Sequence, residues 1–79
     1  MKPYGKPGRD TGILSYESGR NWIKILYKGG DEYLYTYNST GQDHIEIMKD
    51  LAEKGIGLST YVSQNVKDLY DRITSKHRN

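Results

Sequence analysis

The chain has 79 residues, a formal net charge of +2 and no cysteine. This length suits a single domain, and the lack of cysteine excludes a disulfide framework and a thiolate metal site, which fits a cytoplasmic setting. No stretch approaches the roughly 18 consecutive apolar residues that a membrane span requires, so no membrane association is predicted.

The first residues predict a flexible basic arm over 1–12. Pro3, Gly5, Pro7 and Gly8 stand within a short stretch that has no apolar periodicity, so neither a helix nor a paired strand is expected. Positive charge gathers in this arm and in a basic tail over 74–79, whereas the chain between them is net acidic. Basic ends assist nucleic-acid binding in some proteins and merely solubilise others, and both readings stay open.

Alternating apolar and polar residues predict three strands after the arm. They cover residues 12–18, 22–28 and 32–38, and they are separated by a turn at 19–21 and by Gly29-Gly30. Tight turns of this kind join neighbouring antiparallel strands. The sequence therefore predicts a three-stranded antiparallel meander.

After these strands the apolar spacing changes to that of helices. Ile45, Met48, Leu51 and Ala52 predict a first helix that starts near Ser39 or Thr40 and ends at Gly55. A second helix is predicted with Ser59 as N-cap, on an apolar stripe made of Leu58, Val62, Val66, Leu69, Tyr70 and Ile73. The expected fold is α+β, with both short helices packed on one face of the sheet and a single domain over 13–73.

Two segments, IKILYKGGDEYLYTY and LAEKGIGLSTYVSQNV, resemble the KTSC domain. This short module occurs at the C-terminus of some lysyl-tRNA synthetases and as stand-alone small bacterial proteins. The likeness covers residues 13–70 and rests on the alternating strand, the glycine turn, the tyrosine-x-tyrosine motif and two later pairs: Ile23, Ile25, Tyr27, Lys28 to Gly30, Tyr33, Tyr35, Lys54-Gly55 and Tyr61-Val62. The chain departs from the family at Leu58 and Ser59, where the family often has phenylalanine and asparagine. The resemblance implies a fold and an association with synthetases.

The register of the second hairpin decides where the tyrosines point. A three-residue turn over 29–31 places Tyr27 opposite Tyr33 and Ile25 opposite Tyr35. The side chains of these four residues then lie on the same face of the sheet. Because the chain has no phenylalanine, tyrosines are expected to fill the core under the helices. Stacking of nucleic-acid bases on Tyr33 and Tyr35 is the alternative.

The same register places six side chains on the opposite face of the sheet: Trp22, Lys24, Leu26, Lys28, Leu34 and Thr36. An aromatic ring flanked by lysines is typical of surfaces that bind single-stranded nucleic acid. The leading hypothesis is therefore a module associated with RNA or another single strand, binding through Arg20, Trp22, Lys24 and Lys28. The competing hypothesis is a protein-interaction adaptor that docks through Trp22, Leu26 and Leu34 or through the acidic helices.

The sequence does not favour an enzyme. His44 has no second core histidine as a partner and is interpreted as a surface helix residue. The acids of the first helix follow a solvated helical face, and no glycine run matches a phosphate-binding loop. No catalytic residue, metal site or cofactor is predicted, and the oligomeric state is left open.

Overall fold

The computed structural model of the protein describes residues 2–5 and 12–74. Its strands form one antiparallel sheet in the order β1-β2-β3-β4-β5. The strands are β1 (Lys2–Pro3), β2 (Ile13–Ser18), β3 (Trp22–Tyr27), β4 (Glu32–Thr36) and β5 (Arg72–Ile73). The α+β class with an antiparallel sheet is confirmed, but the described sheet has five strands and not the three that were expected.

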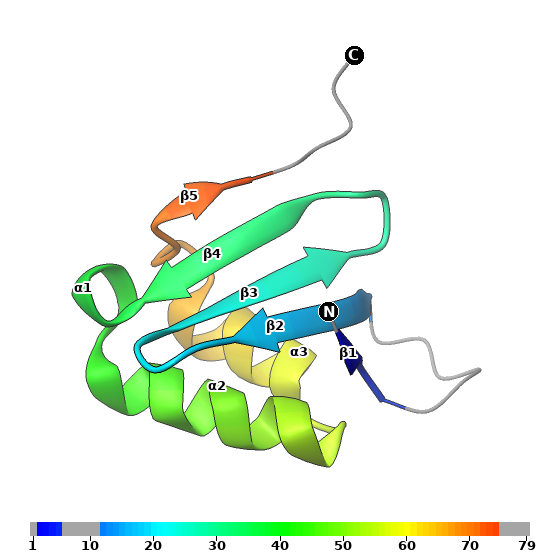
Figure 1. Ribbon diagram of the computed structural model, residues 1–79, viewed down its shortest axis with the longest axis horizontal. Helices are drawn as coiled ribbons and strands as arrows, with labels where there is room; N and C mark the ends of the chain where they lie inside the picture. Colours follow the sequence, from blue (N-terminus) through cyan, green and yellow to red (C-terminus); the bar gives the residue numbers. More distant parts are fainter. Residues whose placement is uncertain (1, 6–11, 75–79) are drawn as a thin grey trace.

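The helical segments lie after β4 in the chain. They are α1 (Tyr37–Thr40), α2 (Gln42–Lys54), α3 (Leu58–Tyr61) and the π-helical turn η1 (Val62–Val66). Figure 1 shows α2 and α3 together beneath one face of the sheet. The expected number of two helices is thus wrong in detail, although both main helices do lie on one face.

Tyrosines take the place of phenylalanine in the core, as expected from the sequence. The ring of Tyr35 is 1% exposed, and Tyr4 and Tyr16 are also buried. They pack with the aliphatic side chains of the sheet and the helices, namely Ile13, Ile23, Ile25, Ile45, Met48, Ala52, Leu58, Val62 and Val66. The side chains that β3 and β4 turn toward the helices therefore form the centre of the molecule.

The β3–β4 hairpin has the expected face pattern but different partners. Ile23 pairs with Tyr35 and Ile25 with Tyr33, two residues away from the predicted partners. The loop is Lys28 to Gly30, because the backbone N–H of Tyr27 donates to the Asp31 carbonyl at 2.8 Å. Side chains alternate with a period of two, so a shift of two residues changes every pair and leaves each residue on its predicted face.

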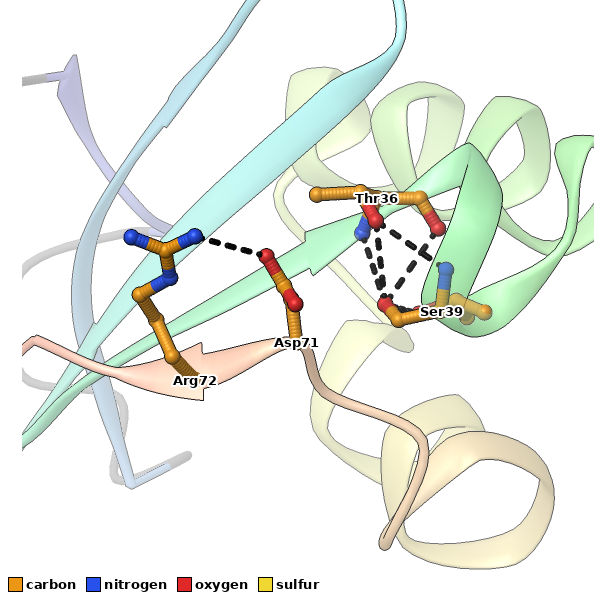
Figure 2. A network of polar contacts seen from close by, with 5 residues as sticks. Thr36, Ser39, Asp71 and Arg72 are labelled. Carbon is orange, nitrogen blue, oxygen red and sulfur yellow. Dashed lines mark hydrogen bonds and ion pairs between the residues drawn. The ribbon is translucent and has the colours of Figure 1, made fainter.

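A short helix, α1, ends the second hairpin where the sequence analysis extended a strand to residue 38. Thr36 is its N-cap, and the Thr36 and Ser39 side chains cap each other's backbone N–H groups (Figure 2). This reciprocal capping satisfies two free donors and turns the chain out of β4. Ser39 and Thr40 therefore belong to α1, and α2 begins after Gly41.

The longest helix, α2, follows the predicted apolar spacing. Ile45, Met48 and Ala52 are buried, and Leu51 is half-buried beside them. Gly55 ends the helix in the left-handed conformation, at φ 75°, and its N–H donates to the carbonyls of the last turn. The predicted glycine cap is confirmed, because glycine adopts this conformation without steric cost.

The second predicted helix is shorter than its apolar stripe. Helical structure ends with η1 at Val66, and the chain then returns to the sheet, where β5 pairs with β4. Leu69 and Ile73 are consequently 39% and 47% exposed and lie outside the core. The predicted N-cap is also wrong, because Gly57 holds that position and Ser59 lies within α3.

The expectation of a loose N-terminal arm is wrong for residues 2–5, and residues 6–11 lie outside the described part of the chain. Lys2 pairs with Tyr16 and Pro3 with Ser15, at the edge of the sheet. Tyr4 is buried, and its hydroxyl accepts a hydrogen bond from the Leu58 N–H at 3.0 Å. A single buried tyrosine thus anchors a segment whose prolines and glycines predicted no structure.

Beyond β5, Thr74 is held to the sheet, although the sequence analysis placed it in the tail. Its N–H donates to the Glu32 carbonyl, and its hydroxyl donates to the Glu32 carboxylate at 3.0 Å. The rest of the predicted basic tail lies outside the described residues.

Candidate ligand-binding site

The open face of the sheet carries four of the residues that the sequence analysis selected. Trp22, Lys24, Leu26 and Leu34 all lie on the face that α2 and α3 leave uncovered, and all four are half-buried. Lys24 pairs with Leu34 across β3 and β4. The structure therefore brings together the apolar set proposed for protein docking.

The indole of Trp22 is engaged within the protein. Gly19, in the preceding turn, lies against the five-membered part of the indole, so that a Cβ built at Gly19 would overlap the indole Nε1. The Lys24 amine lies 6.0 Å from the ring centroid, within the range of a cation–π contact. The Lys24 amine therefore lies over ring surface that a stacked base would need.

Replacing Gly19 with alanine is expected to displace the indole of Trp22. Because Trp22 is the one tryptophan in the chain, its fluorescence emission should shift, and unfolding free energy should fall by about 1 to 3 kcal/mol through overpacking. The exposed neighbour Ser18 supplies the matched control, Ser18→Ala. An unchanged emission spectrum together with unchanged stability would contradict the packing of Trp22 on Gly19.

The two remaining residues of the predicted nucleic-acid site lie apart from each other. Arg20 is in the β2–β3 turn, where Lys49 of α2 donates to its carbonyl at 2.9 Å. Lys28 lies beyond the other end of β3, roughly 20 Å from Trp22 at about 3.3 Å per strand residue. Arg20, Trp22, Lys24 and Lys28 thus follow the full length of one strand and do not converge on one spot.

The charge of the open face is mixed. Glu17 stands directly opposite Lys24 on β2, and Arg72 stands beside Leu34 on β5. Arg72 is itself paired with Asp71 at 3.3 Å, as Figure 2 shows. Acidic, basic and apolar side chains are therefore mixed across this face, whereas a phosphate backbone favours a continuous basic stripe.

A cavity of about 300 Å³ lies on the other side of the sheet, between β3, β4 and the segment formed by α3 and η1. Its floor is formed by Tyr27, Tyr33 and Tyr35. We call this space the tyrosine cavity. It joins a largely apolar, aromatic surface to a few polar groups, as ligand pockets in proteins generally do.

The rings of the tyrosine cavity hold one another in place. Tyr33 meets Tyr27 edge-to-face at a centroid distance of 5.3 Å and meets Tyr70 edge-to-face at 4.9 Å. It lies nearly parallel to Tyr35, at 6.5 Å. Edge-to-face and offset contacts at these distances are favourable, so the half-buried Tyr33 presents a fixed ring to the cavity.

Two hydroxyl groups meet at the floor of the cavity. The Tyr27 and Tyr35 oxygens are 3.4 Å apart, a long and weak hydrogen bond. Burial raises the pKa of both hydroxyls, most strongly that of Tyr35. Both groups therefore keep their protons at neutral pH, and each can donate and accept one hydrogen bond.

Polar side chains line the helical wall and the rim of the cavity. Ser59 and Ser63 lie on the wall beside Val62, while the exposed residues Asp31 and Lys67 lie at the rim. The sequence analysis missed this set. The spacing of four residues from Ser59 to Ser63 to Lys67 was a visible signal, because residues four apart share one side of a helix.

Another cavity, of about 570 Å³, lies between the N-terminal segment and the end of α2. Its charged side chains, Lys2, Glu53 and Lys54, are all exposed, and Lys54 is paired with Asp50 at 3.0 Å. None of these charged groups is held in place by burial. Despite its larger volume, this cavity is the weaker candidate.

His44 joins two helices and is not a freely exposed surface residue. It is half-buried, and its Nδ1 lies 2.6 Å from the Tyr61 hydroxyl of α3. The two rings also meet edge-to-face at 5.7 Å. This pair fixes α3 against α2, which in turn positions the serine wall of the tyrosine cavity.

A second polar cluster ties α2 to α1. The Tyr37 hydroxyl donates to the Glu46 carboxylate at 2.5 Å, and Lys49 forms an ion pair with the same carboxylate at 3.0 Å. These contacts lower the pKa of Glu46, the tyrosine hydrogen bond first, and the same hydrogen bond raises the pKa of Tyr37. Glu46 and Lys49 also line a polar hollow of about 360 Å³ beside Ser18 and Gly19, but both are already engaged with each other, so the cluster serves to hold α2 in place.

The described residues contain no group of three or more His, Cys, Asp or Glu placed to hold a metal ion. No helix among them is long and apolar enough to cross a membrane. Comparison of the chain with family models, with curated proteins and with solved structures found no match.

Proposed function

We propose that the protein is a non-enzymatic binding module that takes an unstacked base of single-stranded nucleic acid into the tyrosine cavity. The observation that carries this proposal is the fixed aromatic surface of the half-buried Tyr27 and Tyr33, above the buried Tyr35 and beneath an opening with an exposed lysine, Lys67. A base stacked on an aromatic side chain contributes about 1 to 3 kcal/mol to binding. The proposal keeps the cytoplasmic setting expected from the sequence and moves the binding site to the helical side of the sheet.

The hydroxyl pair suits the polar edge of a base. The half-buried Tyr27 hydroxyl can donate to or accept from a base, because a hydroxyl rotates to match either arrangement, and the buried Tyr35 hydroxyl lies behind it as its internal partner. Every base has adjacent donor and acceptor positions on its pairing edge. The site is therefore expected to accept different bases with little sequence preference.

Lys67 is the cation that suits the attached phosphate. Among the described residues it forms no ion pair, whereas Lys49, Lys54 and Arg72 each pair with an acid. A lysine that is already exposed and unpaired can neutralise a phosphate without first breaking an internal contact. One such contact predicts a salt slope of about −0.7 for single-stranded nucleic acid.

Titration with single-stranded oligonucleotides tests the proposal and compares the two faces of the sheet. Tyr33→Ala should weaken binding by about 1 to 3 kcal/mol, because it removes one stacking ring, while Tyr33→Phe keeps the ring and should bind nearly as the parent does. Trp22→Ala, on the open face, should leave the affinity unchanged. Lys67→Glu should flatten the salt dependence, and Lys54→Glu, away from the cavity, serves as its control.

Two outcomes would contradict the proposal. Loss of affinity in Trp22→Ala with no effect of Tyr33→Ala would return the site to the open face. The absence of binding even at low salt, where electrostatic attraction is least screened, would dismiss nucleic acid altogether. Protein docking through Trp22, Leu26 and Leu34 would then be the function to pursue.

A further inference from the structure

The rim of the tyrosine cavity carries one acid, Asp31, whose position is set by the β3–β4 turn. Its carbonyl accepts from the Tyr27 N–H at 2.8 Å, and the Gly30 N–H donates to the Tyr27 carbonyl at 3.1 Å. These two bonds close the loop around the glycines. The Asp31 backbone is thereby fixed beside Tyr27, on the sheet side of the opening, while Lys67 comes from the helical side.

The Asp31 side chain differs from the other polar groups of the cavity because it only accepts hydrogen bonds when ionised. It is exposed, and no ion pair joins its carboxylate to another described residue. A carboxylate next to a phosphate-binding lysine repels the phosphate unless the ligand supplies a donor to it. The ligand that suits this rim therefore carries a hydroxyl group between its base and its phosphate.

We infer that Asp31 accepts a hydrogen bond from the ribose 2′-hydroxyl, so that the tyrosine cavity selects RNA over DNA. This inference rests on the proposed function. With the base against Tyr33 and the phosphate at Lys67, the sugar lies between them at the rim, next to the turn. Within a strand the 2′-hydroxyl is the free donor of the ribose, and deoxyribose lacks it. Acidic side chains bind ribose hydroxyls in the same manner in dinucleotide-binding proteins.

The sign of the effect follows from the charge of Asp31. With DNA, the carboxylate repels the phosphates and receives no hydrogen bond in return. With RNA, the hydrogen bond to a charged acceptor offsets this repulsion, and such a bond is equivalent to about a tenfold change in affinity. Removing Asp31 should consequently raise the affinity for DNA and lower or preserve that for RNA.

The test compares cytidine and deoxycytidine oligomers of roughly ten nucleotides, a length within the usual site size for single-strand binding. Cytosine is the same base in both polymers, so that only the sugar differs. The parent protein should bind the RNA oligomer about tenfold more tightly, and Asp31→Ala should bring the two affinities within about twofold of each other. Asp31→Asn keeps one acceptor and should retain part of the preference, whereas Asp50→Asn on α2 should retain all of it.

Each remaining outcome overturns the inference in a recognisable way. The parent protein could bind RNA and DNA equally, and Tyr33→Ala could weaken both. This result would reject the role of Asp31 and would leave the proposed function standing. A full RNA preference in Asp31→Ala would likewise reject it. If neither the RNA oligomer nor the DNA oligomer binds, the inference and the proposed function are both rejected. Thermal unfolding of each variant verifies that the comparison is made between folded proteins.

Discussion

Tyr35→Ala is expected to lower the free energy of unfolding by about 3 to 5 kcal/mol, as large aromatic truncations in protein cores do. The Tyr35 ring is 1% exposed and lies on β4, opposite Ile23 of the central strand β3. It also contacts the rings of Tyr33 and Tyr70, each at 6.5 Å. A domain of this size has a net stability of only about 3 to 5 kcal/mol, so the variant should be largely unfolded in a chemical-denaturation experiment.

Two controls separate the ring of Tyr35 from its hydroxyl and from its neighbour. Tyr35→Phe removes only a 3.4 Å hydrogen bond to Tyr27 and should cost no more than about 1 kcal/mol. Tyr33→Ala removes a half-buried ring and should cost less than Tyr35→Ala. Near-neutral behaviour of Tyr35→Ala would place the ring in solvent and contradict the core described above.

The sheet shows which features of the fold could be predicted from the sequence alone. Alternation placed Ile23, Ile25 and Tyr35 on the buried face, and this assignment is insensitive to an error of two residues in register. The partners themselves depend on which residues form the loop. The chain has Gly29 and Gly30 at positive φ, and these glycines are compatible with more than one three-residue loop, so local sequence did not decide between them.

The helices show where apolar spacing misleads. Leu69 and Ile73 continue the stripe of α3 and η1, yet they leave the core because the chain turns back to form β5. That return is fixed by contacts distant in sequence, such as the hydrogen bond from the Thr40 hydroxyl to the Leu69 carbonyl at 2.7 Å. The spacing of apolar residues alone does not show where a helix ends when the strand that follows it happens to place apolar residues at positions that continue the helical spacing.

The candidate site was predictable only in parts. The sequence identified the tyrosines of β3 and β4 and the residues of the open face, because both sets follow from strand alternation. The tyrosine cavity depends on how α3 and η1 pack against the sheet, which brings Ser63 and Lys67 to Tyr27 across more than thirty residues of chain. No local rule places such groups together, and only the four-residue spacing on the helix hinted at a polar wall.

Tyr4→Ala should lower the free energy of unfolding by about 3 to 5 kcal/mol, although the sequence analysis placed this residue in a loose arm. Tyr4 is 6% exposed and packs in the core between the sheet and the helices. Its hydroxyl also accepts from the N–H of Leu58, the first residue of α3. Early N–H groups of a helix have no partner within the helix, so this tyrosine supplies one from another part of the chain.

Tyr4→Phe isolates that hydrogen bond. It keeps the ring and leaves the buried Leu58 N–H without an acceptor, which should cost about 1 to 3 kcal/mol. Lys2→Ala, at an exposed position of the same strand segment, should change stability by less than about 0.5 kcal/mol. Chemical denaturation of the three variants measures these differences, and removal of residues 1–5 should reproduce the loss seen in Tyr4→Ala. If the deletion leaves the unfolding midpoint unchanged, the segment contributes nothing to the stability of the fold, and the sequence-based expectation of a loose arm would be correct.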